Sequence, residues 1–168
     1  MANTERRPYV VGKQKQIGPP IVIWKGHDYP RIESGLREVR THHIQGPEWV
    51  RSFRRWSLRI ECHILDEPGI VSAFFNFGND PTSPSMGKGR QSRFYKLWVL
   101  ATGEPPKRGE QIDFNALLQK CFLVRIEDSS QDSRGQAKPE GEVYSRITEF
   151  VAVAGPTASN FAHTLTKA

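Results

Sequence analysis

In the segment from residue 56 to residue 64, apolar and polar side chains alternate at every position. Because successive side chains of a β-strand point to opposite faces, this pattern predicts a strand that is buried on one side. The apolar face comprises Trp56, Leu58, Ile60, Cys62 and Ile64, and the other face comprises Ser57, Arg59, Glu61 and His63. The turn sequence Asp66-Glu67-Pro68-Gly69 follows, so the β-branched and aromatic run over residues 70–77 is expected to pair back as a hairpin.

Three further segments have the composition of β-strands. Residues 35–44 mix apolar and polar positions, and the turn sequence Gly46-Pro47 is expected to close this first strand. Residues 121–127 alternate again between apolar and mixed positions. Residues 142–153 return to an apolar pattern and are predicted to form the last strand of the fold.

Between the third and fourth predicted strands the spacing of apolar residues changes to that of a helix. Apolar side chains recur at helical spacing at Phe94, Leu97, Trp98 and Ala101. This spacing predicts a helix from about residue 90 to residue 102 that ends at Gly103. Asp113 is placed to cap a second, short helix in which three apolar side chains share a face, namely Phe114, Leu117 and Leu118.

Long polar segments separate and flank these elements. Residues 79–89 form a loop of unusual length for a compact domain, and residues 128–141 form a second one. The chain has 168 residues, which fits one domain of roughly 100 to 200 residues. We therefore predict a flexible basic arm over residues 1–34, a single domain over 35–153 and a C-terminal tail over 154–168.

The order of the predicted elements indicates the class of fold. Three consecutive strands are followed by a helical connection and a final pair of strands. This is the order of an OB-fold, a five-stranded Greek-key barrel whose strands 2 and 3 and flanking loops bind oligonucleotides. We predict a mostly β protein with one or two helices and an OB-like barrel, with a β-sandwich or another small α+β barrel as the alternatives.

The charge of the chain indicates what kind of partner this fold would bind. The net charge is +6 with 24 Lys plus Arg against 18 Asp plus Glu, so a polyanion is a suitable partner. Residues 1–60 carry 12 basic and 5 acidic side chains, whereas residues 61–110 carry six of each and residues 111–168 carry 6 and 7. The basic excess therefore belongs to the first 60 residues.

The cations gather at two places and are interleaved with aromatic residues. One cluster surrounds Phe53 and Trp56, and the other surrounds Phe94 and Tyr95. Cations that follow phosphates and aromatic faces that stack on bases are the mixture that a single-stranded nucleic-acid groove uses. The alternative is that the aromatic side chains point into the core and the cations form an ordinary solvated rim. The predicted binding residues are Arg51, Arg54, Arg55, Arg59, Phe74, Lys88, Arg90, Arg93, Tyr95 and Lys96.

Two of these residues are chosen from their position in a strand. Phe74 falls between Ala73 and Phe75, on the same side of its strand as Ser72 and Asn76. An aromatic side chain on the polar side of a barrel strand can stack on a base. Packing under the neighbouring loop or arm, or a register shifted by one, is the competing interpretation. Arg59 is expected on the exposed face of the preceding strand.

The layout of residues 35–150 resembles that of small phage and mobile-element proteins regarded as single-stranded-DNA-binding or recombination-accessory proteins. The resemblance lies in the sequences Arg55-Trp56-Ser57-Leu58-Arg59-Ile60-Glu61 and Leu117-Leu118-Gln119-Lys120-Cys121-Phe122-Leu123-Val124, in the aromatic helix that ends at Gly103, and in the closing Tyr144-Ser145-Arg146-Ile147. It implies binding along the surface of the second and third strands, and a role in DNA replication or recombination.

Other chemistries find less support in the sequence. Cys62-His63 and His42-His43 lack the paired spacing of zinc sites, and neighbouring strand residues point to opposite faces. Both cysteines, Cys62 and Cys121, fall in strand patterns that predict burial rather than a reactive thiolate. Acidic residues cluster near turns without the spacing of a two-metal nuclease site. We therefore predict no cofactor, no metal and no enzymatic activity.

The sequence as a whole favours a protein that binds single-stranded nucleic acid, with DNA as the form that the resemblance implies and a homo-oligomer as a further partner to test. The alternative is a protein-interaction or assembly module whose arms contact neighbouring subunits. The chain contains no run of about 18 apolar residues, the length that a membrane-spanning helix needs, and its first residues are too polar for a secretory signal. A cytoplasmic location without membrane contact is therefore expected.

Overall fold

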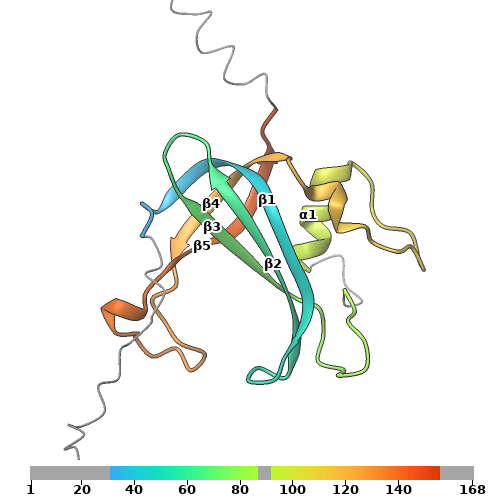
Figure 1. Cartoon of the computed structure of the whole chain (residues 1–168), viewed down its shortest axis with the longest axis horizontal. Helices are drawn as coiled ribbons and strands as arrows, with labels where there is room; N and C mark the ends of the chain where they lie inside the picture. Colours follow the sequence, from blue (N-terminus) through green and yellow to red (C-terminus); the bar gives the residue numbers. More distant parts are fainter. Residues whose placement is uncertain (1–30, 87–91, 156–168) are drawn as a thin grey trace, which may run out of the picture.

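The computed structural model describes residues 31–86 and 92–155 of the chain (Figure 1). Its strands are β1 (Gly35–Val50), β2 (Arg55–Ile64), β3 (Ile70–Asn76), β4 (Cys121–Asp128) and β5 (Ser145–Val153). One α-helix, α1 (Arg93–Thr102), and two short 3₁₀ turns, η1 (Phe114–Leu117) and η2 (Glu140–Glu142), complete the elements. The prediction of a mostly β protein with a helix before the fourth strand is confirmed.

The five strands form one closed sheet in the order β1-β2-β3-β5-β4, in which β4 pairs back to β1. Neighbouring strands are antiparallel except for β3 and β5, which are parallel and are paired at Ser72 and Arg146. Such a closed sheet leaves an interior that side chains fill and an exterior that carries the alternate residues of each strand.

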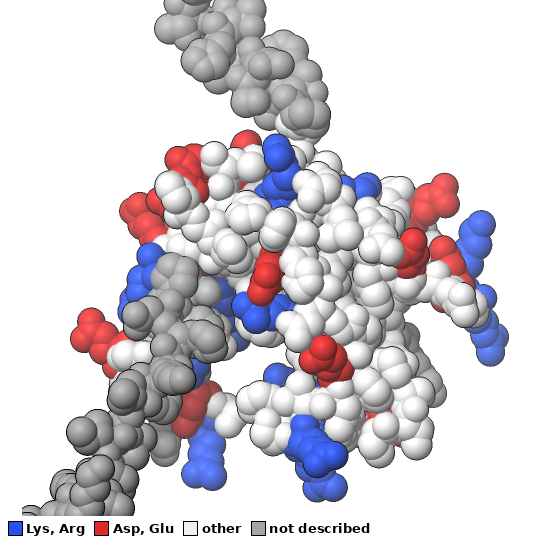
Figure 2. All heavy atoms as spheres, in the orientation of Figure 1, with Lys and Arg blue, Asp and Glu red and all other residues white. Residues whose placement is uncertain are grey.

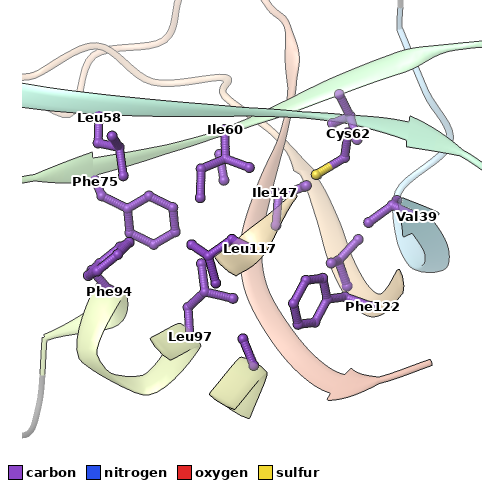
Figure 3. Packing of buried hydrophobic residues seen from close by; sticks show 14 of the residues in the cluster. Val39, Leu58, Ile60, Cys62, Phe75, Phe94, Leu97, Leu117, Phe122 and Ile147 are labelled. Carbon is purple, nitrogen blue, oxygen red and sulfur yellow. The ribbon is translucent and has the colours of Figure 1, made fainter. Parts of the chain in front are cut away.

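The interior of the sheet is the hydrophobic core (Figure 3). As the alternation predicts, Leu58, Ile60 and Cys62 of β2 are completely buried. Phe94 and Leu97 of α1 point toward the same interior, and the Phe94 ring meets that of Phe75 edge to face at 5.5 Å between centroids. The helix therefore covers one end of the closed sheet, and burial of its apolar face is what holds it there.

Local signals fix both ends of α1. The Ser92 hydroxyl accepts a hydrogen bond from the backbone N–H of Tyr95 at 3.1 Å, which caps the first turn. Gly103 ends the helix in the left-handed conformation, with φ 81°, as the sequence predicts. The predicted start at residue 90 lies outside the described residues. Asp113 caps η1 through a hydrogen bond from the N–H of Asn115 at 3.0 Å, so the second predicted helix is a single 3₁₀ turn.

The first strand is longer than its sequence predicts, and the predicted turn at Gly46-Pro47 is wrong. The strand continues through these residues to Val50, because an irregularity in the pairing between Gln45 and Glu48 accommodates them. Gly46 has φ 97°, and a Cβ atom there would lie 2.7 Å from the carbonyl oxygen of Ser57 in β2. The close approach of the two strands at this point therefore requires glycine. As a result β1 and β2 form a long hairpin that projects beyond the rest of the sheet (Figure 1).

Core contacts begin before Gly35, where the sequence analysis places the start of the domain. Ile32 is 8% exposed and packs in the core cluster. Its backbone N–H donates to the Ser145 hydroxyl at 2.9 Å, and that hydroxyl donates to the Ile32 carbonyl at 3.2 Å. The last strand begins at Ser145 rather than at residue 142, because residues 140–142 form η2. In the described parts of the chain, no helix has the length and apolarity to cross a membrane.

Candidate nucleic-acid interface

A basic cleft lies where β2, β3, β5 and the start of α1 meet. It has a volume of about 390 Å³, and three arginines from three different elements open onto it, namely Arg55, Arg93 and Arg146. Phe74 forms part of its wall, and no aspartate or glutamate is among its described lining residues. The remaining lining residues are Ser57, Phe75, Asn76, Ser92 and Phe94. We refer to this site as the arginine cleft.

Strand register explains how the outward-facing residues come together. Arg59 of β2 pairs with Phe74 of β3, and Ser72 of β3 pairs with Arg146 of β5. Since side chains alternate across each strand, all four lie on the outer face while Ala73 and Phe75 are buried. The prediction that Phe74 occupies the polar side of its strand is therefore confirmed, and its side chain is 39% exposed.

Arg59 is held beside Phe74 by polar contacts. Its guanidinium carbon lies 5.9 Å from the centre of the Phe74 ring. The same guanidinium forms an ion pair with Glu61 at 2.8 Å and donates to the Ser72 hydroxyl at 3.2 Å. Part of its charge is therefore balanced within the protein, so Arg59 supports the aromatic wall and contributes less net positive potential than an unpaired arginine would.

Arg93 has a structural role that its sequence position does not reveal. Its guanidinium donates to the carbonyl oxygens of Phe74 at 3.4 Å and Ile147 at 3.2 Å, and it lies 5.4 Å from the centre of the Phe75 ring. Burial, and secondarily the nearby charge of Arg146, lower the pKa of Arg93 from its usual value. The side chain therefore bridges β3 and β5 and places its positive charge in the lining of the arginine cleft.

The predicted N-terminal cluster separates into two parts. Arg55 opens onto the arginine cleft, whereas Arg51 and Arg54 belong to the turn that ends the β1–β2 hairpin. Phe53 in this turn is 62% exposed, and the Arg55 guanidinium lies 5.0 Å from the centre of its ring. Figure 2 shows basic side chains gathered at this hairpin end, at the bottom of the view, and basic and acidic side chains interspersed elsewhere on that face.

The helix contributes less to the cleft than the sequence suggests. Lys96 opens onto a neighbouring cleft of about 480 Å³, which Arg93 and Phe75 also line, so the two clefts adjoin. The second cleft is mixed in charge, because Glu127 and Glu149 are among its lining residues. Tyr95 is half-buried on α1 and lines neither cleft. Lys88 and Arg90 lie outside the described residues.

Arg146 is the cleft residue that sequence reasoning missed. It sits in the closing strand between the buried residues Ser145 and Ile147, so alternation alone predicts that it faces outward. What the sequence does not supply is the parallel pairing of β5 with β3, which brings Arg146 next to residues about 70 positions earlier in the chain.

The two cysteines differ in burial: the predicted burial is confirmed for Cys62, whereas Cys121 is only half-buried. Cys62 is completely buried, and desolvation, with a smaller effect from the charge of Glu61, raises the pKa of its thiol to about 12. His63 is exposed on the opposite face, as predicted. In the described residues, no group of three or more His, Cys, Asp or Glu side chains is arranged to hold a metal ion.

Comparison with known proteins adds no family to these observations. No protein-family model matches the chain, and no curated protein matches its sequence. The arginine cleft and the β1–β2 hairpin are therefore the features that bear on function.

Proposed function

We propose that this protein binds single-stranded nucleic acid in the arginine cleft and acts by binding rather than by catalysis. The observation that carries the proposal is the convergence of Arg55, Arg93 and Arg146 around the exposed ring of Phe74. The guanidinium groups neutralise phosphates, and the ring stacks on a base, an interaction worth about 1 to 3 kcal/mol per base. Stacking requires an unpaired base, which is why a single strand suits this site better than a duplex.

The topology supports an OB-like assignment for the closed sheet. The strand order β1-β2-β3-β5-β4 and a helix between β3 and β4 are the arrangement of a five-stranded Greek-key barrel. In such barrels the second and third strands and the loop between the first two bind oligonucleotides. The arginine cleft and the β1–β2 hairpin occupy these positions here. A role in replication or recombination of a mobile element rests on the sequence resemblance alone, as does the preference for DNA.

Fluorescence anisotropy with a labelled single-stranded oligonucleotide at two salt concentrations tests the proposal. We expect binding that weakens as salt rises, because each phosphate contact releases counterions. Replacing two of the three cleft arginines in Arg55→Ala/Arg146→Ala should weaken binding at least about tenfold and reduce the salt slope by about 2. Phe74→Ala should weaken binding by about 1 to 3 kcal/mol and leave the salt slope unchanged.

A control arginine is available on another part of the surface. Arg134 is exposed in the loop between β4 and β5 and lines neither the arginine cleft nor the cleft beside it. Arg134→Ala should therefore change the affinity less than the cleft variants do. Undetectable binding at low salt, or equal losses for Arg134→Ala and the cleft variants, would rule out the arginine cleft as the binding site.

A further inference from the structure

We propose that the end of the β1–β2 hairpin acts as a wedge at the boundary between single-stranded and paired nucleic acid. This inference rests on the proposed function, because it requires the arginine cleft to hold the single strand. The wedge is defined as residues 51–55, which are Arg51, Ser52, Phe53, Arg54 and Arg55. Apolar wedge residues such as Phe and Leu are inserted between base steps by proteins that unstack and kink a duplex.

Phe53 has the exposure that a wedge needs. At 62%, it is the most exposed of the large hydrophobic side chains in the part of the chain that the structure describes. It stands at the end of a hairpin rather than on a flat face, so a base pair can approach it from the front. The ring contacts the Arg55 guanidinium, whose carbon lies 5.0 Å from its centre, and the rest of its exposed surface is open to a partner.

Ring packing and hydrogen bonds next to the turn hold the β1–β2 hairpin that carries Phe53 in place. Trp49 of β1 and Trp56 of β2 meet edge to face, with 5.8 Å between their ring centroids. The indole N–H of Trp56 donates to the Asp80 carbonyl at 2.7 Å, and its backbone N–H donates to the Gly78 carbonyl at 2.8 Å. Unstacking a base step costs a few kcal/mol, so a wedge must be supported by a stem that does not bend away.

The charge of the hairpin end suits a duplex terminus. Three of its five residues are arginines, and none is acidic. A duplex carries one negative charge per about 1.7 Å of its axis, counting both strands. The arginines on either side of Phe53 can therefore meet the phosphates of both strands while the ring meets the terminal base pair.

The wedge is also in line with the cleft. Arg55 belongs to both, and Phe53 precedes Arg59, the partner of Phe74 in the sheet, by six residues. Within β2, Arg55 lies four residues before Arg59, about 13 Å at 3.3 Å per residue, and Phe53 lies in the turn just beyond Arg55. A single strand that leaves the cleft past Arg55 reaches Phe53 next, and the first paired base would meet the ring there.

The test uses the full chain and a forked duplex with single-stranded tails of about 4 to 16 nucleotides, the site sizes typical of such modules. The first paired position carries 2-aminopurine, whose emission rises when the base is unstacked. We expect the wild-type protein to raise this emission to a plateau and Phe53→Ala to abolish the rise. The affinity of Phe53→Ala for a single strand should fall by less than about threefold, below the loss expected for a stacking residue.

Phe53→Leu separates a wedge from a stacking platform. Leucine serves as a wedge but has no ring to stack on a base, so the rise in emission should persist in this variant. Leu65→Ala is the matched control, because Leu65 is 43% exposed and follows β2 at its far end. It should behave as wild type. Since Phe53 and Leu65 are both exposed, all variants should keep the wild-type unfolding midpoint, which is measured alongside.

Three results would overturn the inference. If the wild-type protein binds the tail without raising the emission, the wedge is refuted while the proposed function stands. If Phe53→Ala and Phe53→Leu weaken single-strand binding as strongly as Phe74→Ala does, Phe53 is a stacking platform. If no oligonucleotide with a single-stranded region binds at low salt, the proposed function fails and the wedge fails with it.

Discussion

Cys62 and His63 are neighbours in β2 with opposite surroundings. The thiol is completely buried, and the imidazole is exposed on the outer face. Because burial raises the pKa of Cys62 from 9.0 to about 12, folding favours the protonated thiol. The folded state therefore binds more protons than the unfolded state between these pH values, and stability falls as the pH rises through this range. Below pH 9.0 the thiol is protonated in both the folded and the unfolded state, and the stability that is lost at higher pH is fully present.

This residue gives a prediction about alkaline stability. The free energy of unfolding of the wild-type protein should decrease more steeply above pH 9.0 than that of Cys62→Ala. Between pH 9.0 and about pH 11 the wild-type protein should lose a few kcal/mol more of its free energy of unfolding than Cys62→Ala does. Urea unfolding of both proteins at several pH values measures it. Two curves that remain parallel would contradict the assigned environment of the thiol.

At the scale of elements, the junction between β3 and β5 depends on a side chain from α1. The strands pair at Ser72 and Arg146, and the Arg93 guanidinium joins them through the carbonyls of Phe74 and Ile147. Arg93→Ala should lower the free energy of unfolding by about 1 to 3 kcal/mol, because charge-assisted hydrogen bonds are lost. Arg93→Lys should retain only part of the stability that Arg93→Ala loses, since the lysine ammonium group lacks the planar, two-pronged donor geometry of a guanidinium. Urea unfolding measures both, and an unchanged midpoint for Arg93→Ala would contradict this role.

The elements also show what a sequence can and cannot predict here. Strict alternation predicted β2 and the outward position of Phe74, because each depends only on the period of a strand. The end of β1 was not predicted, since Gly46-Pro47 has the composition of a turn and the pairing irregularity that absorbs it depends on β2. Arg146 was missed for a similar reason: its neighbours in the cleft come from distant parts of the chain.

At the scale of the whole molecule, the start of the folded part can be tested by truncation. Removing residues 1–30 leaves Ile32 in place, whereas removing residues 1–34 deletes a buried side chain and its two hydrogen bonds to Ser145. The shorter truncation should leave the unfolding midpoint nearly unchanged. The longer one should lower the free energy of unfolding by at least about 1.5 to 3 kcal/mol. Equal stability of the two truncated proteins would exclude Ile32 from the core.

The same truncation bears on the alternative function. An assembly module whose N-terminal arm reaches a neighbouring subunit would form a discrete oligomer that the shorter truncation disrupts. Light scattering of the full chain and of residues 31–168 distinguishes the two functions, because an assembly module would lose its oligomers whereas all lining residues of the arginine cleft lie between positions 55 and 146 and are kept. Because the shorter truncation preserves the core, a loss of oligomers would not be a consequence of unfolding.

The anchoring of Ile32 has a consequence for how the arm meets a ligand. Ile32 is fixed to Ser145, and the next residue of β5 is Arg146, which lines the arginine cleft. Residues 1–30 carry five basic and two acidic side chains, and they join the described chain beside Ile32, close to the polyanion that we propose the arginine cleft binds. Any contact between these cations and that ligand would be intramolecular within the complex, governed by effective concentration rather than by the concentration of protein in solution.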